Sequence, residues 1–369
     1  MFYRSVGGAL FTLLFCAFFF SCKRKTKPEL AFYHWSVNPT YNYQLFAQKQ
    51  NTVKELKPSA LFVKIMDIDW DNIYEAYPST TFSFENLSTS LGDSIVKSLH
   101  LIPAIFITNK ALEKTDSSKI PELARKIVLK TDQLVKGRRK YDAYTGEKLV
   151  IDSNIHYNEL QLDCDWTAGT QKKYFALLTN IKKLLPHNSI SSTLRLHQYK
   201  YPTKTGVPPV DEVYLMCYNT GDVKKPEEKN SIFDYQKAKP YFEHISGYPK
   251  KLNFALPAFS WCVIFKDNKF YKIDNNIDVS FFSDAAATQK YDQNNLYQIL
   301  TDTVINNNFL RRGDLIKWEH LSDADMQQAA DLCARAANSE NFRVVFYDLD
   351  HINTNNYETI HKAFNRFNF

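Results

Sequence analysis

Pairs of aspartates recur at the ends of apolar segments, and carboxylates are among the groups that most often supply acid–base chemistry to a protein site. The segment 159–165, Glu-Leu-Gln-Leu-Asp-Cys-Asp, ends with Asp163 and Asp165. Two further pairs end segments of the same kind: Asp67 with Asp69, and Asp348 with Asp350. Aromatic or amide side chains stand at the ends of other segments: Trp35, Tyr218, Asn219, Trp261 and Tyr347. Carboxylates can accept hydrogen bonds from hydroxyl groups and aromatic rings offer flat apolar faces, so a sugar is one ligand that such a set would suit.

Eight strand-like apolar segments position these residues, and an amphipathic helical pattern lies between most of them. The segments cover residues 29–35, 60–68, 101–108, 159–165, 190–197, 211–218, 251–259 and 342–350. Nearly continuous apolar strands that alternate with helices predict a parallel sheet buried on both faces. A (β/α)8 TIM barrel is the simplest closure of eight such units, so we predict this fold. An open doubly wound sheet is the alternative, although the first strand is not followed by the glycine-rich turn that this fold favours.

The barrel prediction brings the aspartates together, because reactive groups of such barrels lie at the C-terminal ends of the strands. Along the fourth strand, alternation turns Gln161, Asp163, Asp165 and Thr167 toward the barrel axis. Six carboxylates at one end repel one another, so some must be paired or protonated. We expect Lys64, on the second strand, to reach Asp163.

Four segments resemble glycoside hydrolase family 18, the chitinase class. Leu-Gln-Leu-Asp-Cys-Asp-Trp-Thr is similar to the family's fourth-strand signature DGxDxDWE through Asp163, Asp165 and Trp166. Met216 and Tyr218 match a sixth-strand Met-x-Tyr-Asp, in which Asn219 replaces the aspartate. Pro257 and Phe259 resemble a seventh-strand segment, and Tyr347 takes the place of the tryptophan that floors the sugar site. The four segments follow one another in the family's order.

The resemblance implies a carbohydrate ligand and leaves the chemistry open. Thr167 stands where the family has its proton-donating glutamate, and a threonine hydroxyl has no usable pKa near neutrality. Catalysis would then involve Asp165 and Asp163, with another carboxylate as the acid. The predicted substrate-binding residues are Trp35, Asp67, Asp69, Trp166, Tyr218, Asn219, Trp261, Tyr347, Asp348 and Asp350. Three hypotheses remain: a hydrolase, a non-catalytic carbohydrate-binding protein, and a scaffold that binds protein partners.

The N-terminus predicts export and attachment to a membrane. Arg4 precedes a short apolar run that ends in Phe-Phe-Ser-Cys, which resembles a bacterial lipoprotein signal with Cys22 as the lipidated residue. We therefore predict a signal peptide over residues 1–22, a basic tether over 23–28, and one barrel domain over 29–369 with an insertion at about 260–320. An uncleaved anchor helix is the alternative. Both place the protein in the bacterial cell envelope, periplasmic or surface-exposed.

Composition and motif content exclude several classes of function. Of the 369 residues 44% are hydrophobic and 15% aromatic, which indicates a large core, and the net charge is +6. No basic stripe with interleaved aromatics is present, so we expect no nucleic-acid partner. The six cysteines lack metal-finger spacing, the aspartates do not match a calcium loop, and no GxSxG or P-loop motif is present. We expect neither metal nor cofactor, and a monomer.

Overall fold

The computed structural model describes residues 27–35, 43–80, 82–135, 139–141, 148–150, 157–243, 247–352 and 354–368. The predicted signal peptide with Cys22, the first part of the tether, and the turn predicted around Thr145–Gly146 lie outside these residues.

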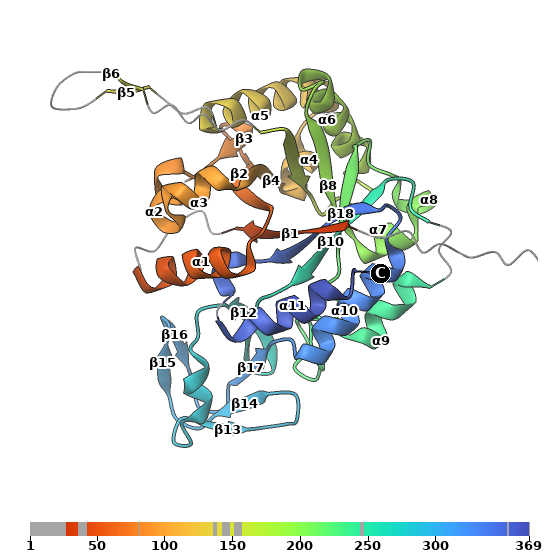
Figure 1. The fold of residues 1–369 in the computed structure, drawn as a ribbon. Helices are drawn as coiled ribbons and strands as arrows, with labels where there is room; N and C mark the ends of the chain where they lie inside the picture. Colours follow the sequence, from red (N-terminus) through yellow and green to blue (C-terminus); the bar gives the residue numbers. More distant parts are fainter. Residues whose placement is uncertain are drawn as a thin grey trace, which may run out of the picture.

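Eight parallel strands close into a barrel, which confirms the predicted TIM-barrel fold (Figure 1). Their order around the barrel is β1-β18-β10-β9-β8-β7-β4-β2, and pairing of β1 with β2 closes the ring. The strands are β1 (Lys27–His34), β2 (Ala60–Asp71), β4 (His100–Ile107), β7 (Glu159–Asp163), β8 (Ser189–Arg195), β9 (Glu212–Met216), β10 (Lys251–Pro257) and β18 (Asn341–Tyr347). All eight coincide with the predicted segments to within a few residues. The C-terminal ends of these strands form one end of the barrel, called the mouth below.

Helices surround the barrel; the longer ones coincide with the amphipathic patterns, whereas the short helices at 109–114, 196–200 and 202–205 were not predicted. The helices are α1 (Tyr43–Leu56), α2 (Phe84–Leu91), α3 (Asp93–Ser98), α4 (Asn109–Lys114), α5 (Ile120–Val135), α6 (Gln171–Leu184), α7 (Leu196–Lys200), α8 (Pro202–Thr205), α9 (Tyr235–Ala238), α10 (Asp323–Ala336) and α11 (Tyr357–Asn365). The helix predicted before β4 is divided between α2 and α3 because Gly92, with φ 85°, takes a conformation that ends one helix before the next begins. Ser322 caps α10 and exchanges hydrogen bonds with Asp325, as its sequence predicts.

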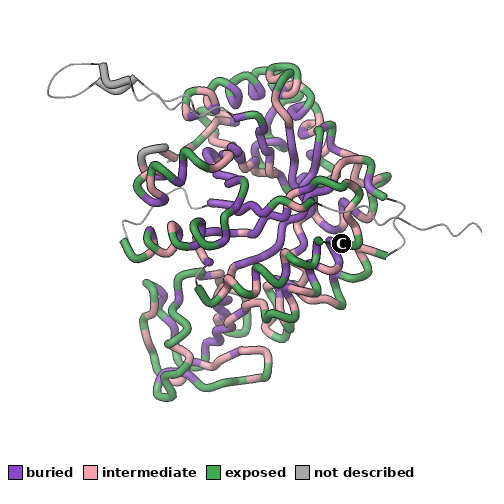
Figure 2. Tube along the Cα trace, viewed as in Figure 1, coloured by how far each residue is buried: buried purple, intermediate pink, exposed green. Residues whose placement is uncertain are grey.

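The core of the barrel has two parts, and the buried strands in the centre of Figure 2 separate them. The larger part lies between strands and helices and includes the outward-facing Leu160, Leu162 and Cys164 of β7 and its following turn. The smaller part fills the barrel interior with Phe62, Tyr214 and six other buried side chains. Because successive strand residues face opposite sides, the residues between the outward-facing ones belong to the interior.

Polar side chains close the N-terminal end of the barrel. Arg343 of β18 donates from Nη1 to Glu159 Oε2 at 2.6 Å and to Tyr214 Oη at 2.8 Å. Ser191 Oγ donates to the other oxygen of Glu159 at 2.6 Å. This satisfied buried network leaves the opposite end, the mouth, as the open face of the barrel.

A second, antiparallel sheet follows β10 and lies at the bottom of Figure 1. Its strand order is β12-β11-β17-β14-β13, with the separate hairpin β15-β16 beside it. The strands are β11 (Trp261–Lys266), β12 (Lys269–Asp274), β13 (Thr288–Lys290), β14 (Leu296–Ile299), β15 (Thr303–Ile305), β16 (Asn308–Leu310) and β17 (Leu315–Glu319). A turn at Asp267 and Asn268 joins β11 to β12, and both residues have positive φ, at 51° and 59°.

Two short hairpins complete the fold. β5 (Arg139–Tyr141) pairs with β6 (Lys148–Val150) on the two sides of the predicted 145–146 turn. β3 (Glu75–Ser79) pairs with the end of β2 and was not predicted. No helix within the described ranges is long and apolar enough to cross a membrane.

Candidate functional site

Five aromatic rings converge at the mouth, and this set is called the mouth cluster: Tyr33, Trp35, Tyr218, Phe259 and Tyr347. Tyr347 is its centre. Its ring centroid lies 5.8 Å from Tyr33, 5.9 Å from Trp35, 5.9 Å from Tyr218 and 5.6 Å from Phe259. The Tyr218 ring stacks on Tyr347 at an interplanar angle of 26°, whereas Phe259 meets Tyr347 edge-on at 86°. The cluster therefore joins strand ends that are more than 300 residues apart in the chain.

Strand alternation explains why these rings meet. Tyr33 lies in the barrel interior, and Trp35, Tyr218 and Tyr347 pack partly buried on the same interior core. Burial raises the pKa of Tyr33, Tyr218 and Tyr347 above the ordinary value, so their hydroxyl groups stay protonated. Tyr33 is 2% exposed and supports the cluster from below, so the partly exposed rings of Tyr218 and Tyr347 supply the apolar surface and the neutral hydroxyls.

Asn219, predicted as a ligand contact, lies at the start of the loop that leaves the mouth cluster after β9. It is exposed with φ 55°, and its backbone N–H donates to Ile232 O at 2.7 Å. This geometry starts the loop that follows β9, and it leaves Tyr218 as the residue of this segment that joins the cluster.

Lys64 and the aspartates of β2 form the next part of the mouth. The Lys64 ammonium lies 5.6 Å from the centre of the Trp35 ring and 3.2 Å from Asp67 Oδ1. Thr108 Oγ1 donates to Asp69 Oδ1 at 3.0 Å. The expected partner of Lys64 was Asp163, but its ion pair is with Asp67, because a β-bulge between Lys64 and Met66 shifts the register and turns Asp67 inward.

Asp163 is a partly buried carboxyl group on the interior side of β7. Burial raises its pKa to about 7, and the nearby Asp165 adds to this effect. A hydrogen bond of 2.6 Å from Thr193 Oγ1, with the charges of Lys64 and Arg195, lowers the pKa and limits the shift. Asp163 therefore exchanges a proton close to neutral pH.

Asp165 is exposed and pairs with Arg195, the last residue of β8. Arg195 Nε lies 3.4 Å from Asp165 Oδ1, and Nη2 donates to Trp166 O at 2.8 Å. Asn109 Nδ2 also donates to Asp165 O at 2.7 Å. These bonds fix the segment after β7 and give the Asp165 carboxylate a cationic neighbour.

Trp166 and Thr167 complete this segment in different surroundings. The Trp166 ring is 2% exposed and stacks on Tyr174 at 5.3 Å, and its Nε1 donates to Thr205 O. The ring lies in the core against the helices, so it is not available to a ligand. Thr167 is exposed, and its carbonyl accepts from Thr170 and Gln171 at the start of α6.

Asp348 and Asp350 bind protein groups at the side of the barrel. Asp348 Oδ1 lies 2.7 Å from His351 Nδ1, and the Asp348 carboxylate raises the pKa of His351 against the opposite effect of burial. Asp350 contacts Lys49 of α1 and lies 3.2 Å from His34 Nδ1. Burial would raise the pKa of Asp350, but His34 and Lys49 hold it well below its usual range. The two carboxylates thus link β1, α1 and the end of β18.

Trp261 extends the mouth cluster toward the second sheet. Its ring centroid lies 5.1 Å from that of Phe259, and its Nε1 donates to Glu319 Oε2 at 2.8 Å. In the sheet register Trp261 pairs with Glu319, so both side chains lie on the same face. Trp261 therefore lies where the barrel mouth meets the insertion.

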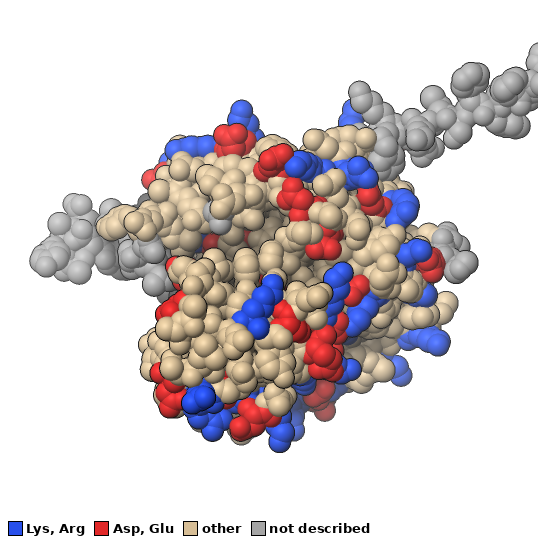
Figure 3. Space-filling model, turned by 90° about the horizontal axis from the view of Figure 1, so that it is seen from below, with Lys and Arg blue, Asp and Glu red and all other residues tan. Residues whose placement is uncertain are grey.

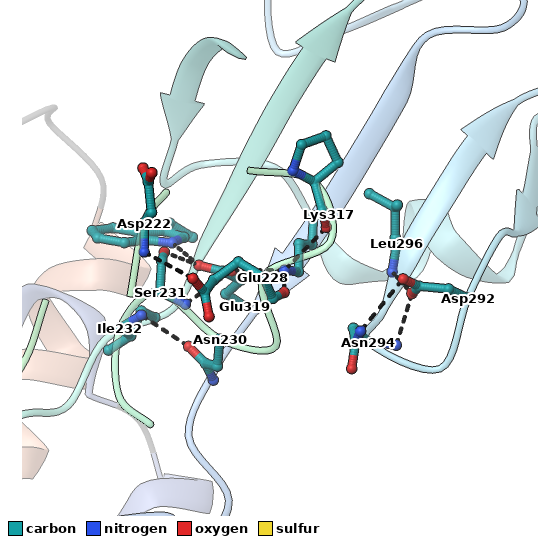
Figure 4. Close-up of polar contacts among 12 residues, drawn as sticks. Asp222, Glu228, Asn230, Ser231, Ile232, Asp292, Asn294, Leu296, Lys317 and Glu319 are labelled. Carbon is teal, nitrogen blue, oxygen red and sulfur yellow. Dashed lines mark hydrogen bonds and ion pairs between the residues drawn. The ribbon is translucent and has the colours of Figure 1, made fainter. Parts of the chain in front are cut away.

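Glu319 is the centre of a buried polar network, shown in Figure 4. It is 3% exposed and accepts from the backbone N–H of Ser231 at 3.1 Å, from Ser231 Oγ, and from Lys317 at 3.2 Å. Lys317 is fully buried and also donates to the carbonyls of Pro226 and Glu228. The network binds the loop after β9 to the second sheet through Ser231 and Glu319, and the hydrogen bond from Trp261 to Glu319 fixes the orientation of the indole ring.

Sequence reasoning missed several residues that shape the site. Phe259 was noticed only as part of a motif, and Arg195 and Glu319 were not considered. A conspicuous signal was available for Glu319 and Lys317, since two charged residues alternate with Ile316 and Trp318 inside a strand-like segment. Arg195 offered no comparable signal, because its partner lies on another strand.

Charge is mixed around the second sheet. Figure 3 shows the face seen from below in Figure 1, where acidic and basic side chains are interspersed and uncharged residues occupy much of the left half. Among the residues described, no group of three or more His, Cys, Asp or Glu side chains is placed to hold a metal ion.

Comparisons with known proteins define the fold. No family model matches the chain, and no curated protein matches its sequence. Among solved structures, the chitinase of Chromobacterium violaceum has a TM-score of 0.52 at 9% identity over 91% of this chain and 99% of that one. The family GH18 chitinase of Cycas revoluta bound to allosamidin has 0.51 at 11% over 92% and 99%, and the Bacillus cereus spore cortex-lytic enzyme SleL has 0.50 at 14% over 92% and 75%.

The class that these observations define is a (β/α)8 barrel with the fold of family GH18. At this level of identity the likeness concerns the fold alone. Which function the barrel serves must be argued from its own residues.

Proposed function

We propose that the mouth binds a carbohydrate and that the protein does not cleave it by the usual family-18 mechanism. The observation that carries the proposal is the mouth cluster, in which rings from three barrel strands and from the segment after β10 meet beside hydrogen-bonding carboxylates. Such a surface packs against the C–H faces of a sugar while Asp67 and Asp69 accept hydrogen bonds from its hydroxyls. Chitinases of the same fold have been solved with N-acetylglucosamine oligomers, which supports a glycan as the ligand class.

Two local features oppose the usual cleavage reaction. Thr167 cannot donate a proton to a glycosidic oxygen at neutral pH. Arg195 lies 3.4 Å from Asp165, so this carboxylate already has a cationic partner on the neighbouring strand. Both features favour binding without cleavage.

A hydrolase that uses Asp163 is the second candidate, and one observation favours it. A pKa of about 7 is close to what a general acid needs at neutral pH. Asp163 is nevertheless largely buried and receives a hydrogen bond from Thr193, so a ligand would have to reach it past Asp165.

We further propose that Cys22 carries a lipid that holds the barrel at a membrane of the cell envelope. The support is the short apolar N-terminal run that ends at this cysteine.

The test is a panel of neutral oligosaccharides built from N-acetylglucosamine, glucose, mannose or xylose, mixed with the full chain in detergent micelles. Calorimetry measures binding, and chromatography of the same samples detects shortened products. Binding with unchanged sugars supports the proposal. Cleavage that is lost in Asp163→Asn supports the hydrolase, and the absence of any binding refutes both.

A further inference from the structure

Strand β2 continues beyond the barrel and forms a hairpin with β3. Its pairing with β1 ends at Val63, whereas β2 itself ends at Asp71. The outer part pairs antiparallel with β3 in the register Asp67 to Ser79, Asp69 to Tyr77 and Asp71 to Glu75. The hairpin therefore projects past the mouth on the side of the barrel opposite the insertion (Figure 1).

The register assigns the two faces of this hairpin. Ile68 and Ala76 are buried in the outer core, and Trp70 packs against it. The alternate residues Asp67, Asp69 and Tyr77 must then lie on the other face, which continues the barrel interior. The contacts of Asp67 with Lys64 and of Asp69 with Thr108 agree with this orientation.

A row of side chains leads from the mouth cluster along this face. Lys64 joins Trp35 to Asp67, and Asp69 and Tyr77 follow as a cross-strand pair. Tyr74, in the turn, lies 6.0 Å from Tyr77 between ring centroids and is 69% exposed. Asp67, Asp69, Tyr74 and Tyr77 are called the hairpin strip below.

The hairpin holds its exposed rings in place before any ligand arrives. Asp71 Oδ1 accepts from the backbone N–H groups of Ile73 and Tyr74 at 2.7 and 3.2 Å, which fixes the turn. Glu75 pairs with Lys119, and Lys110 donates to Trp70 O at 3.3 Å. An aromatic ring exposed to water has an unfavourable hydration free energy, and a ligand that covers the ring removes this term. Because the ring is already ordered, binding costs little further conformational entropy.

From this continuity we infer that the hairpin strip is an outer subsite for an extended, neutral oligosaccharide whose other end occupies the mouth cluster. The inference rests on the proposed function and adds the length and charge of the ligand. Two tyrosine rings offer packing surface and two carboxylates accept from hydroxyls, the same combination that the mouth provides. Lys64 and Lys119 compensate Asp67 and Glu75, so Asp69 and Asp71 supply the excess negative charge of this surface, which disfavours a polyanionic chain.

The experiment measures affinity against a ladder of N-acetylglucosamine, glucose, mannose and xylose oligomers of increasing length. In the natural protein, affinity rises with length until the strip is filled. Tyr74→Ala and Tyr77→Ala each lower affinity for the longest oligomers about 5-fold and leave the shortest unchanged. Tyr291→Ala is the matched control, because Tyr291 is 61% exposed but lies beyond β13 in the second sheet.

The outcomes separate the inference from the proposed function. The outer subsite is overturned if affinity is the same at every oligomer length. It is also overturned if the tyrosine variants lose no affinity, or lose it equally for short and long oligomers. In each case binding at the mouth still stands. Oligogalacturonate that binds as tightly as the neutral chain overturns the charge argument. No binding of any oligomer overturns the proposed function and the inference with it.

Discussion

The buried pair Lys317–Glu319 offers a test of how the mouth is held, because a matched exposed pair exists in the same chain. Lys317 and Glu319 lie 3.2 Å apart with side chains 0% and 2% exposed. Lys126 and Glu122 of α5 also lie 3.2 Å apart, but with side chains 43% and 53% exposed. The nitrogen–oxygen distance is equal in the two pairs, so their difference in burial should dominate what each substitution costs.

Glu319→Gln leaves the ammonium of Lys317 buried without its counter-charge, which costs about 3–5 kcal/mol of unfolding free energy. Glu122→Gln removes a solvated pair and costs about 0–1 kcal/mol. When Lys317→Met is combined with Glu319→Gln, no charge remains buried, so most of the loss is recovered and the two sites show a coupling of about 2–3 kcal/mol.

Urea unfolding followed by tryptophan fluorescence measures Glu319→Gln, Lys317→Met, their double variant, Glu122→Gln and the natural chain. The indole Nε1–H resonance of Trp261, assigned by its absence in Trp261→Phe, reports the local contact. It should move strongly in Glu319→Ala and less in Glu319→Gln, since the glutamine oxygen still accepts a hydrogen bond. A cost below about 1 kcal/mol for Glu319→Gln, or strictly additive effects in the double variant, would refute the reasoning.

Four further outcomes follow from the structure. Asp163 binds a proton more tightly in the folded than in the unfolded chain, because its pKa is raised from 3.8 to about 7, so its contribution to stability is lost as pH rises between these two values. Asp163→Asn should remove this part of the pH dependence of the urea midpoint. Asp350→Asn leaves Lys49 buried without a partner, which should cost about 3–5 kcal/mol at pH 7, whereas the ligand affinity per folded molecule, measured by calorimetry, stays unchanged. Trp166→Ala empties a core position and should cost about 3–5 kcal/mol in the same unfolding assay, again with unchanged affinity. Cys22→Ser should move the protein from the detergent phase to the aqueous phase in partition experiments and abolish labelling with a fatty-acid analogue.

Most of the barrel could be predicted because its strands are buried on both faces. Segments such as 60–68 and 342–350 are nearly continuous in apolar residues, and only a parallel sheet covered by helices accommodates eight of them. The full length of β2 could not be predicted. Its outer part carries Asp67, Asp69 and Asp71, which suggest the end of a buried strand, but carboxylates cost little where a hairpin extends into water.

The partners of the aspartates could not be predicted, because they come from distant strands and helices. Asp350 meets Lys49 across about 300 residues of sequence, and Asp165 meets Arg195 on the next strand of the barrel. The predicted set of aspartates at the strand ends therefore included residues that face the mouth together with residues that form ion pairs with other parts of the protein. Trp166 was predicted to bind the substrate, but its ring lies in the outer core, on the side that Leu160, Leu162 and Cys164 also face.

The most direct test of the central claim is the affinity of Tyr347→Ala for the oligosaccharide that the natural chain binds best. Tyr347 contacts every other ring of the mouth cluster, so its removal should weaken binding about 30-fold. Tyr291→Ala should bind as the natural chain does, and circular dichroism confirms that both variants are folded. A folded Tyr347→Ala that keeps full affinity would show that the sugar binds elsewhere and would contradict the account.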